Sequence, residues 1–265
     1  MKNLVVVIVV FSILALAFYL GNKSRQSGAS TETVQLTIPA EQEPIPIAQK
    51  SPEPQPALSA EATVPVVLPL PELDQSDGVI QRELVGLYDA VKLEKLFNFD
   101  SAIRHFVVII DNMTSAKLPQ KFKFTRLPQD KFMVQEGVAG AEYIDPANYN
   151  RYTLYVHFIE SLDLDKTVAL YFKYYPLFQQ AYAELGYPDR NFNDRLIEVV
   201  EHLLATPEIQ EPIKLLQPKV YYTFADAKLE ALSAGQKLMI RIGLSNAVRV
   251  KSWLQHLHIA LTAVR

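Results

Sequence analysis

The sequence contains no cysteine and little glycine, and both absences exclude particular kinds of chemistry. Without thiols the chain has no disulfide, no thiolate zinc site, no iron–sulfur cluster and no cysteine nucleophile. Only nine of its 265 residues are glycine, and it has neither of the phosphate-binding strings GxGxxG and GxxxxGK[ST]. The formal net charge of −3 gives no electrostatic support for nucleic-acid binding. We therefore predict no cofactor and no nucleic-acid partner.

Charged residues are also missing from one N-terminal segment, Leu4–Leu20, which reads LVVVIVVFSILALAFYL. At about 1.5 Å per residue, a helix of ~17 residues spans about 26 Å, the lower edge of a bilayer's hydrocarbon core. We predict a single-pass transmembrane anchor over residues 1–23. A cleaved signal peptide is the alternative, because Ala15 and Ala17 fit the small-x-small rule for cleavage, although the apolar run continues past them.

The charges that flank this segment nearly balance, with Lys2 and the amino terminus on one side and Lys23 and Arg25 on the other. The very short N-terminal flank favours an N-terminus in the cytoplasm. We therefore expect a bacterial inner-membrane protein whose C-terminal domain lies in the periplasm.

Residues 24–71 form a proline-rich region that holds nine of the 17 prolines. Proline has no N–H and a fixed φ, so neither a helix nor a strand ladder propagates through it, and few bulky side chains are present to offset the ordering entropy. We predict a disordered linker that, as polyproline II at ~3.1 Å per residue, reaches on the order of 100 Å. It is either a passive spacer or a proline-motif ligand for a partner.

Residues 72–265 show mainly helical periodicity and predict a single helical-bundle-like domain with a few short strands. The predicted helices are one that starts at Ser76 or Asp77 and carries Ile80, Leu84, Leu87 and Val91, then Ser101–Ser115, Pro146–Leu162, Leu164–Leu185, Asp194–Ala205, Ala227–Leu232, Ala234–Ile242 and Ser245–Val264. One short strand is expected within Lys131–Glu136, and a short strand or an extended connector within Ile213–Phe224.

Local signals set several of these helix ends. Asp163 and Asn193 are predicted N-caps, because their side chains accept hydrogen bonds from the first amides of a helix. Pro176 falls inside an unbroken apolar stripe, which predicts a kinked helix rather than two helices. Gly186 is expected just after that helix in a left-handed conformation.

Several strings of the domain resemble one family of uncharacterised bacterial proteins, known only as a domain of unknown function. These strings are PLPELDQSD, FVVIIDN, NYNRY, YPLFQQAYAELGYPD, LLATP and FADAKLEALSAGQKLMIRIG. The resemblance covers residues 69–257. It implies a membrane-associated envelope protein behind a short hydrophobic segment, and it implies no activity.

Histidines and acidic residues show no pattern that predicts a metal or catalytic site. His256 and His258 are two apart, so on a helix they point ~200° away from each other and cannot share a metal. Asp163 and Asp165 lie where helix capping already explains acidic residues. No serine lies in a GxSxG string. Catalytic carboxylates that are distant in sequence stay open as an alternative.

The C-terminal residues 217–265 carry seven Lys or Arg against Asp226 and Glu230, a net charge of +5. Arg241 and Arg249 belong to this basic set. Such a surface could meet an anionic polymer, a lipid headgroup or an acidic partner, or it could simply be solvated.

Arg151 is the most informative single residue, because it falls within the apolar arc of the predicted helix Pro146–Leu162, close to Tyr155. A guanidinium group in such a place needs a carboxylate, carbonyl groups or a bound anion. The acidic residues considered as internal partners are Asp111, Glu184, Asp226 and Glu230. The alternative is a pocket for a carboxylate- or phosphate-bearing ligand.

These observations predict a non-enzymatic interaction or scaffolding module that binds another envelope protein or a cell-wall polymer. The candidate binding residues are Arg151, Tyr155, Glu184, Arg241 and Arg249, and no catalytic or metal-binding residue is predicted. The alternatives are a hydrolase that acts on an envelope polymer and a small-anion-binding domain centred on Arg151.

Overall fold

The computed structural model describes residues 70–119, 121–122, 125–126, 128 and 131–263. The predicted anchor and all but the last two residues of the predicted linker therefore lie outside the described residues. Within the described part, no helix has both the length and the apolar character needed to cross a bilayer.

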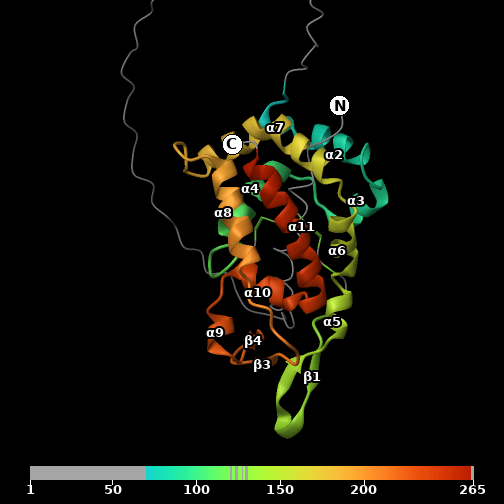
Figure 1. Ribbon diagram of the computed structural model, residues 1–265, viewed down its shortest axis with the longest axis vertical. Coiled ribbons are helices and arrows are strands. Elements are labelled where there is room, and N and C mark those ends of the chain that lie inside the picture. The colour runs from blue at the N-terminus through green and yellow to red at the C-terminus, as the bar shows by residue number, and fades with distance from the viewer. Residues whose placement is uncertain (1–69, 120, 123–124, 127, 129–130, 264–265) are drawn as a thin grey trace, which may run out of the picture. The chain divides into compact units, whose positions relative to one another are not determined.

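The domain is mainly helical, which confirms that part of the predicted fold class (Figure 1). Its helices are η1 (Leu73–Gln75), α2 (Asp77–Val85), α3 (Ala90–Leu96), α4 (Ala102–Asn112), η2 (Val138–Gly140), α5 (Ala147–Asn150), α6 (Thr153–Glu160), α7 (Leu164–Glu184), α8 (Phe192–Leu204), α9 (Ala227–Glu230), α10 (Ala234–Arg241) and α11 (Leu244–Thr262). The strands are β1 (Val134–Glu136), β2 (Glu142–Ile144), β3 (Lys214–Leu216) and β4 (Thr223–Phe224).

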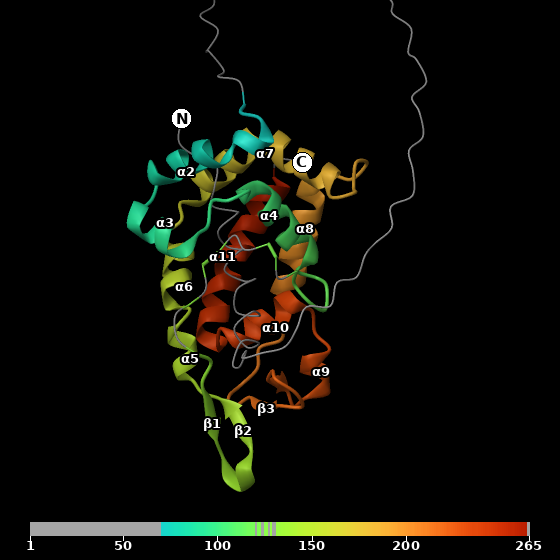
Figure 2. The same ribbon diagram turned by 180° about the vertical axis from the view of Figure 1, so that it is seen from behind.

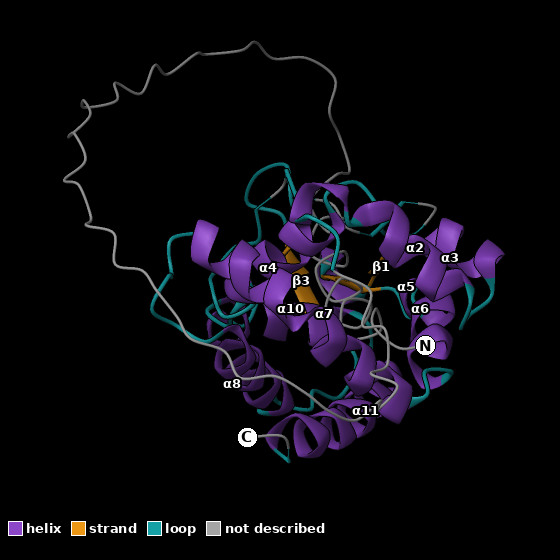
Figure 3. Ribbon diagram, turned by 90° about the horizontal axis from the view of Figure 1, so that it is seen from above, coloured by secondary structure: helices purple, strands orange, loops and turns teal. Residues whose placement is uncertain are grey.

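The main core lies where α4, α7, α8 and α11 pack together. The rings of Phe106, Phe178 and Phe192, one from each of α4, α7 and α8, meet there with centroids 5.5 to 6.1 Å apart, and such aromatic contacts add to the stabilisation from burial. Helix α11 also packs against α6. Viewed from above, α8 and α11 lie next to each other (Figure 3).

The four strands form a small antiparallel sheet in the order β1-β2-β3-β4. A second, smaller core of Ile144, Ile213, Leu215, Phe224 and Ile240 packs on it. The strand predicted within Lys131–Glu136 is confirmed as β1. The segment Ile213–Phe224 contains two paired strands rather than one.

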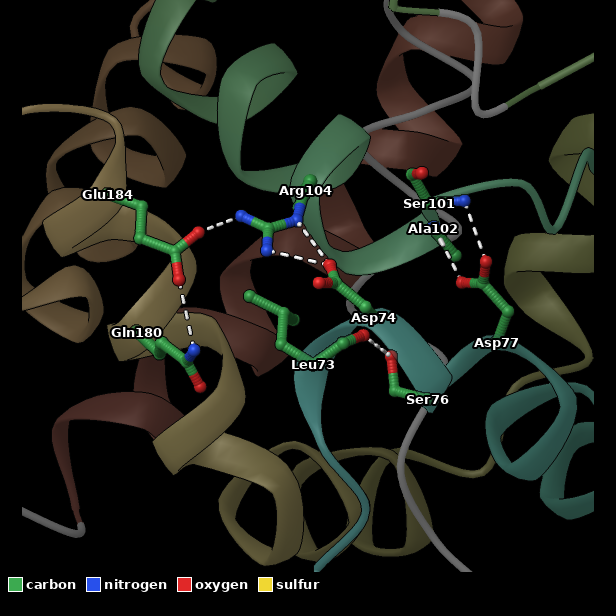
Figure 4. A network of polar contacts seen from close by, with 9 residues as sticks. All are labelled: Leu73, Asp74, Ser76, Asp77, Ser101, Ala102, Arg104, Gln180 and Glu184. Atoms are coloured by element: carbon green, nitrogen blue, oxygen red, sulfur yellow. Dashed lines mark hydrogen bonds and ion pairs between the residues drawn. The ribbon is translucent and has the colours of Figure 1, made fainter.

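The start of the domain is fastened to α4 and α7 by polar contacts (Figure 4). Asp77 accepts hydrogen bonds from the backbone amides of Ser101 at 2.7 Å and Ala102 at 2.8 Å. Arg104 of α4 donates to Asp74 at 2.8 Å and also pairs with Glu184 of α7. These contacts hold η1 and the first turn of α2 against the main helical core.

Helix α7 follows its prediction closely. Asp163 accepts a hydrogen bond from the Lys166 amide at 3.1 Å, which confirms it as the N-cap. Pro176 lies inside the continuous helix, and Gly186 follows with φ 115°. The predicted N-cap of the next helix is wrong, because Asn191 rather than Asn193 accepts hydrogen bonds from the first amides of α8.

Two predicted helices are each divided in the structure. The first ends at Val85 with Gly86 as its C-cap, and Asp89 caps a separate α3 through the Lys92 amide at 2.9 Å. Val91, which was expected on the apolar face, is therefore 59% exposed. The helix expected over Pro146–Leu162 is divided into α5 and α6 by a turn at Arg151.

The break before α6 follows from hydrogen bonding at Asn148. Its side chain is fully buried and bonds to the backbone of Met133 and Asp145. Asparagine side chains that bond to the backbone in this way compete with a regular helix. The amides of Arg151 and Tyr152 then bond three residues back instead of four, so Arg151 belongs to a turn.

Candidate functional site

A surface groove about 320 Å³ in volume lies beside the contact between α6 and α11. Its lining comes from the last residue of α6 and from two turns of α11, namely Glu160, Val248, Arg249, Ser252, Trp253 and His256. Its volume is at the lower end of the range of small-molecule sites. The predicted candidate Arg249 lies in this groove.

Arg249 and Glu160 form a two-point ion pair across the groove. Arg249 Nε donates to Glu160 Oε1 at 2.5 Å, and Arg249 Nη2 pairs with Oε2. The hydrogen bond from Arg249 lowers the pKa of the Glu160 carboxyl, and partial burial opposes this. The carboxylate is thus held in its ionised form, and the paired planar groups fix the orientation of Arg249.

Asn246 supports Arg249 from one turn earlier on α11. Its Oδ1 accepts from Arg249 Nη1 at 3.4 Å, and its Nδ2 donates to the carbonyls of Ile242 at 2.9 Å and Tyr149 at 3.1 Å. The groove is therefore built on a helix whose first turn is tied to α5 and to the end of α10. Gly243 allows this close approach, because a Cβ there would lie 2.6 Å from the Tyr149 ring. The φ of Gly243 is 87°, a conformation that also favours glycine.

Trp253, the single tryptophan of the chain, lines the groove beside Arg249. Its side chain is buried, with 8% exposure, and its indole Nε1 has no acceptor among the described residues. Val248 and His256 are exposed at the rim. The groove therefore combines a buried aromatic side chain with an ion pair and exposed side chains. Such a mixed polar and aromatic surface is typical of protein interaction sites.

The other predicted candidates do not gather at this groove. Glu184 lies near the end of α7, where it pairs with Arg104 and accepts from Gln180 at 2.9 Å (Figure 4). Arg151 lies in the turn before α6 and donates to Asn148 Oδ1 at 3.1 Å. The five candidates therefore belong to at least three separate places.

Arg151, Tyr155 and Arg241 do share one environment, around the buried hydroxyl of Tyr152. Burial raises the pKa of Tyr152, and the charges of Arg151 and Arg241 oppose this increase. Burial also raises the pKa of Tyr155, whose hydroxyl donates to the Arg126 carbonyl at 3.1 Å. Two guanidinium groups thus act on one tyrosine at the base of α6.

Arg241 is itself a buried cation at the end of α10, 6% exposed. Its guanidinium carbon lies 5.1 Å from the centre of the Phe224 ring, a cation–π contact. Desolvation lowers the pKa of Arg241, and the negative charge of Glu230 opposes this.

Lys237, one turn before Arg241, is a buried cation that was not among the predicted binding residues. Its Nζ donates to the Glu230 carboxylate at 3.1 Å and to the Glu230 carbonyl at 3.0 Å. Glu230 also accepts from the Phe224 amide at 2.9 Å. Every residue of α10 is buried. The signal available in the sequence was the lysine within this short helix.

The acidic residues proposed as partners of Arg151 contact other groups. Asp111 pairs with Arg195 at 3.0 Å, Glu184 with Arg104, and Glu230 with Lys237. Asp226 caps α9 through the Lys228 amide at 2.7 Å. Each of these contacts joins residues whose pairing was not predicted from the sequence.

The histidines described below occupy packing or surface positions. His202 Nε2 lies 2.7 Å from the Ser233 hydroxyl, and His258 Nε2 lies 2.8 Å from Glu201. His105 packs edge-on against Phe122, and His256 lies at the groove. In the part of the chain that the structure describes, no three His, Asp or Glu side chains gather to hold a metal ion.

The described residues form a mainly helical domain with a small sheet, and its sequence matches a family model. The family described as "Protein of unknown function (DUF3014)" matches residues 102–258. The chain belongs to this family. No curated protein and no solved structure is similar enough to the chain to match.

Proposed function

We propose that this chain is a non-enzymatic interaction module of the bacterial envelope. In this proposal Leu4–Leu20 anchors it in the inner membrane, residues 24–71 act as a spacer, and the helical domain binds another protein or a cell-wall polymer in the periplasm. The anchor is proposed from the uncharged apolar run. The spacer is proposed from the clustered prolines.

The observation that carries the proposed binding role is the groove between α6 and α11. It is open to solvent and is built on two packed helices, and its charged residues are held in place by the Arg249–Glu160 pair. Rigid positioning of aromatic and charged side chains reduces the entropy lost on binding. Such a surface suits an extended partner better than a small enclosed substrate.

The chemistry of the same groove does not favour a glycosidase site at Glu160. A glycosidase needs a protonated carboxylic acid near neutral pH, and so its pKa must be raised. The pKa of Glu160 is instead lowered by Arg249. This carboxylate is therefore poorly suited to act as a general acid.

The test uses the full-length chain in bacterial cells, with chemical crosslinking followed by co-purification from membranes. Ser252→Arg places a bulky cation in the groove at an exposed position. Gln255→Arg makes the same kind of change on the same helix, outside the groove lining. We expect Ser252→Arg to reduce the crosslinked partner about tenfold, the effect of ~1.4 kcal/mol of lost affinity, while Gln255→Arg leaves it unchanged. Equal yields from both variants would refute the role of the groove.

The small-anion alternative retains one supporting observation, the pair of guanidinium groups that act on Tyr152. It is tested by the thermal unfolding of the full-length chain with and without inorganic phosphate. If Arg151 holds the anion, phosphate at a concentration of about 100 times its Kd adds ~2.7 kcal/mol to the free energy of unfolding. Arg151→Leu should abolish that increase, and Arg82→Leu, at an exposed site on α2, should not. No phosphate-dependent increase in the unmodified chain would rule this function out.

A further inference from the structure

The hairpin formed by β1 and β2 carries an exposed apolar tip. The two strands pair in antiparallel register, and residues 137–141, with the sequence GVAGA, join them. Val138 is 92% exposed, more than any other large hydrophobic residue that the structure describes. The hairpin extends from the opposite end of the domain to η1 and α2 (Figures 1 and 2). The tip therefore lies far from the point where the chain enters the domain.

The backbone of this tip has a defined and unusual conformation. Ala139 has φ 58° and ψ 33°, a left-handed region that residues with a Cβ rarely adopt, and Gly140 follows with φ 71°. The Gly137 amide donates to the Ala141 carbonyl at 2.7 Å and closes the turn. A Cβ at Gly137 would lie 2.5 Å from the Tyr143 ring, so that ring packs against the base of the tip.

Two carboxylates face each other directly below the apolar tip. The register places Glu136 of β1 opposite Glu142 of β2, and like charges in directly opposed positions destabilise a strand pair. Glu142 accepts a hydrogen bond from the Tyr222 hydroxyl at 3.0 Å, while Glu136 is exposed. An exposed valine, a left-handed alanine and opposed glutamates thus lie together within one turn. Departures from local preference of this kind concentrate at functional sites.

We propose that this tip is an insertion element for a partner protein. Val138 enters an apolar pocket of the partner, and lysine or arginine side chains at the rim of that pocket pair with Glu136 and Glu142. Apolar anchors in pockets supply much of the affinity of protein interfaces, and charge complementarity sets the choice of partner. The two carboxylates disfavour an anionic lipid surface. This inference concerns a surface distinct from the α6–α11 groove and goes beyond the function proposed for it.

The test places a photo-crosslinking amino acid at position 138 of the full-length chain in the cells that produce it. The control site is position 91 on α3, where the native valine is 59% exposed. We expect a protein adduct from position 138 and none from position 91. Mapping of the adduct should locate the crosslink among apolar residues of the partner with lysine or arginine close by.

A charge reversal then separates loss of the interface from loss of folding. Glu136→Lys should reduce the adduct about tenfold, because the new positive charge faces the basic rim of the partner. The same change should leave the thermal unfolding temperature unchanged or raise it, since a lysine there lies opposite Glu142. Glu94→Lys, at an exposed site on α3, is the matched control and should leave the adduct unchanged.

Four results would overturn the proposal. They are an adduct with lipid, an adduct with a second copy of the chain, a yield at position 138 no higher than at position 91, and a protein adduct that Glu136→Lys does not reduce.

Discussion

Arg195 of α8 and Asp111 of α4 join two helices of the core through two hydrogen bonds. Arg195 Nε donates to Asp111 Oδ1 at 3.0 Å, and Arg195 Nη2 donates to the Asp111 carbonyl at 2.5 Å. The guanidinium also reaches the Thr114 hydroxyl at 2.7 Å and Glu198 at 2.9 Å. The side chains of Arg195 and Asp111 are only 12% and 16% exposed. One arginine therefore makes several of the polar contacts at the C-terminal end of α4.

Removal of this arginine should be costly. Breaking a fully buried ion pair costs roughly 3–5 kcal/mol, and the residual exposure here reduces our expectation for Arg195→Leu to about 2 kcal/mol. The free energy of unfolding in urea measures it. Glu198→Gln is the control, because Glu198 is 55% exposed, and it should cost less than about 1 kcal/mol. Similar losses from both variants would show that Asp111 contributes little.

Asn148 should be a second sensitive position. Its side-chain amide donates to the carbonyls of Met133 at 2.7 Å and Asp145 at 2.8 Å, and its oxygen accepts from the Met133 amide at 2.9 Å. Asn148→Ala leaves these buried groups unsatisfied, and we expect a loss of about 2–4 kcal/mol in the free energy of unfolding. Asn150→Ala, two residues further along and exposed, should change stability by less than ~0.5 kcal/mol.

Stability should fall as the solution becomes mildly acidic, in part because of His202. Burial, together with the nearby charge of Arg195, lowers the pKa of His202 below its ordinary value of 6.5. The unfolded chain therefore takes up this proton at a higher pH than the folded chain, and protonation favours unfolding. The free energy of unfolding should decrease as the pH falls from 6.5 to the folded pKa.

Urea unfolding at a series of pH values between about 5 and 8 tests this dependence. His202→Gln should reduce the slope in the acidic range, whereas His157→Gln, at an exposed position of α6, should not. Burial lowers the pKa of His105 as well, so part of the slope should remain in the His202 variant. An unchanged slope in that variant would contradict the assignment.

The hairpin tip offers a test in which a substitution increases stability. Ala139 has φ 58°, and the left-handed conformation costs a residue with a Cβ roughly 1–2 kcal/mol. Glycine relieves this strain, but its greater flexibility in the unfolded chain offsets part of the gain. Ala139→Gly should therefore raise the free energy of unfolding by about 0.5 kcal/mol. Ala141 has an ordinary φ of −68°, so Ala141→Gly should lower it by roughly 0.5–1 kcal/mol.

The proposed anchor and its orientation are tested by a reporter fused after Arg265. A reporter that is active only outside the cytoplasm should work in this fusion, and the intact chain should resist alkaline extraction from membranes. Mature protein that begins at Phe18 would show that the segment is a cleaved signal peptide instead. A reporter active only in the cytoplasm would reverse the orientation.

Much of the helical fold could be predicted from the sequence because its determinants are local. The N-cap at Asp163, the left-handed Gly186 and the apolar stripe that continues past Pro176 all lie within a few residues of the helix they define. One of the two divided helices, over Pro146–Leu162, was missed for the opposite reason. The break before α6 depends on bonds between Asn148 and Met133, 15 residues away in sequence.

The candidate sites were harder to predict, because their contacts join distant residues. Arg249 was identified from the charge excess of the C-terminal region, but Glu160 lies 89 residues before it, and no sequence spacing predicts that pair. Arg195 was missed altogether, since Asp111 lies 84 residues before it. The periodicity that placed Arg151 on an apolar arc assumed a continuous helix. That assumption is wrong, because a turn at Arg151 interrupts the helix.

The polar contacts at the start of the domain bear on how it would respond to tension. A pull on the chain ahead of Leu70 reaches Leu73, which is buried in the main core, and then Asp74 and Asp77, which are both bonded to the beginning of α4. These bonds and the burial of Leu73 resist the force together. Asp74 is 81% exposed and Arg104 is 35% exposed, and salt screens such surface pairs. The mechanical resistance of the first residues would therefore decrease with ionic strength, while that of the core beneath them would change little.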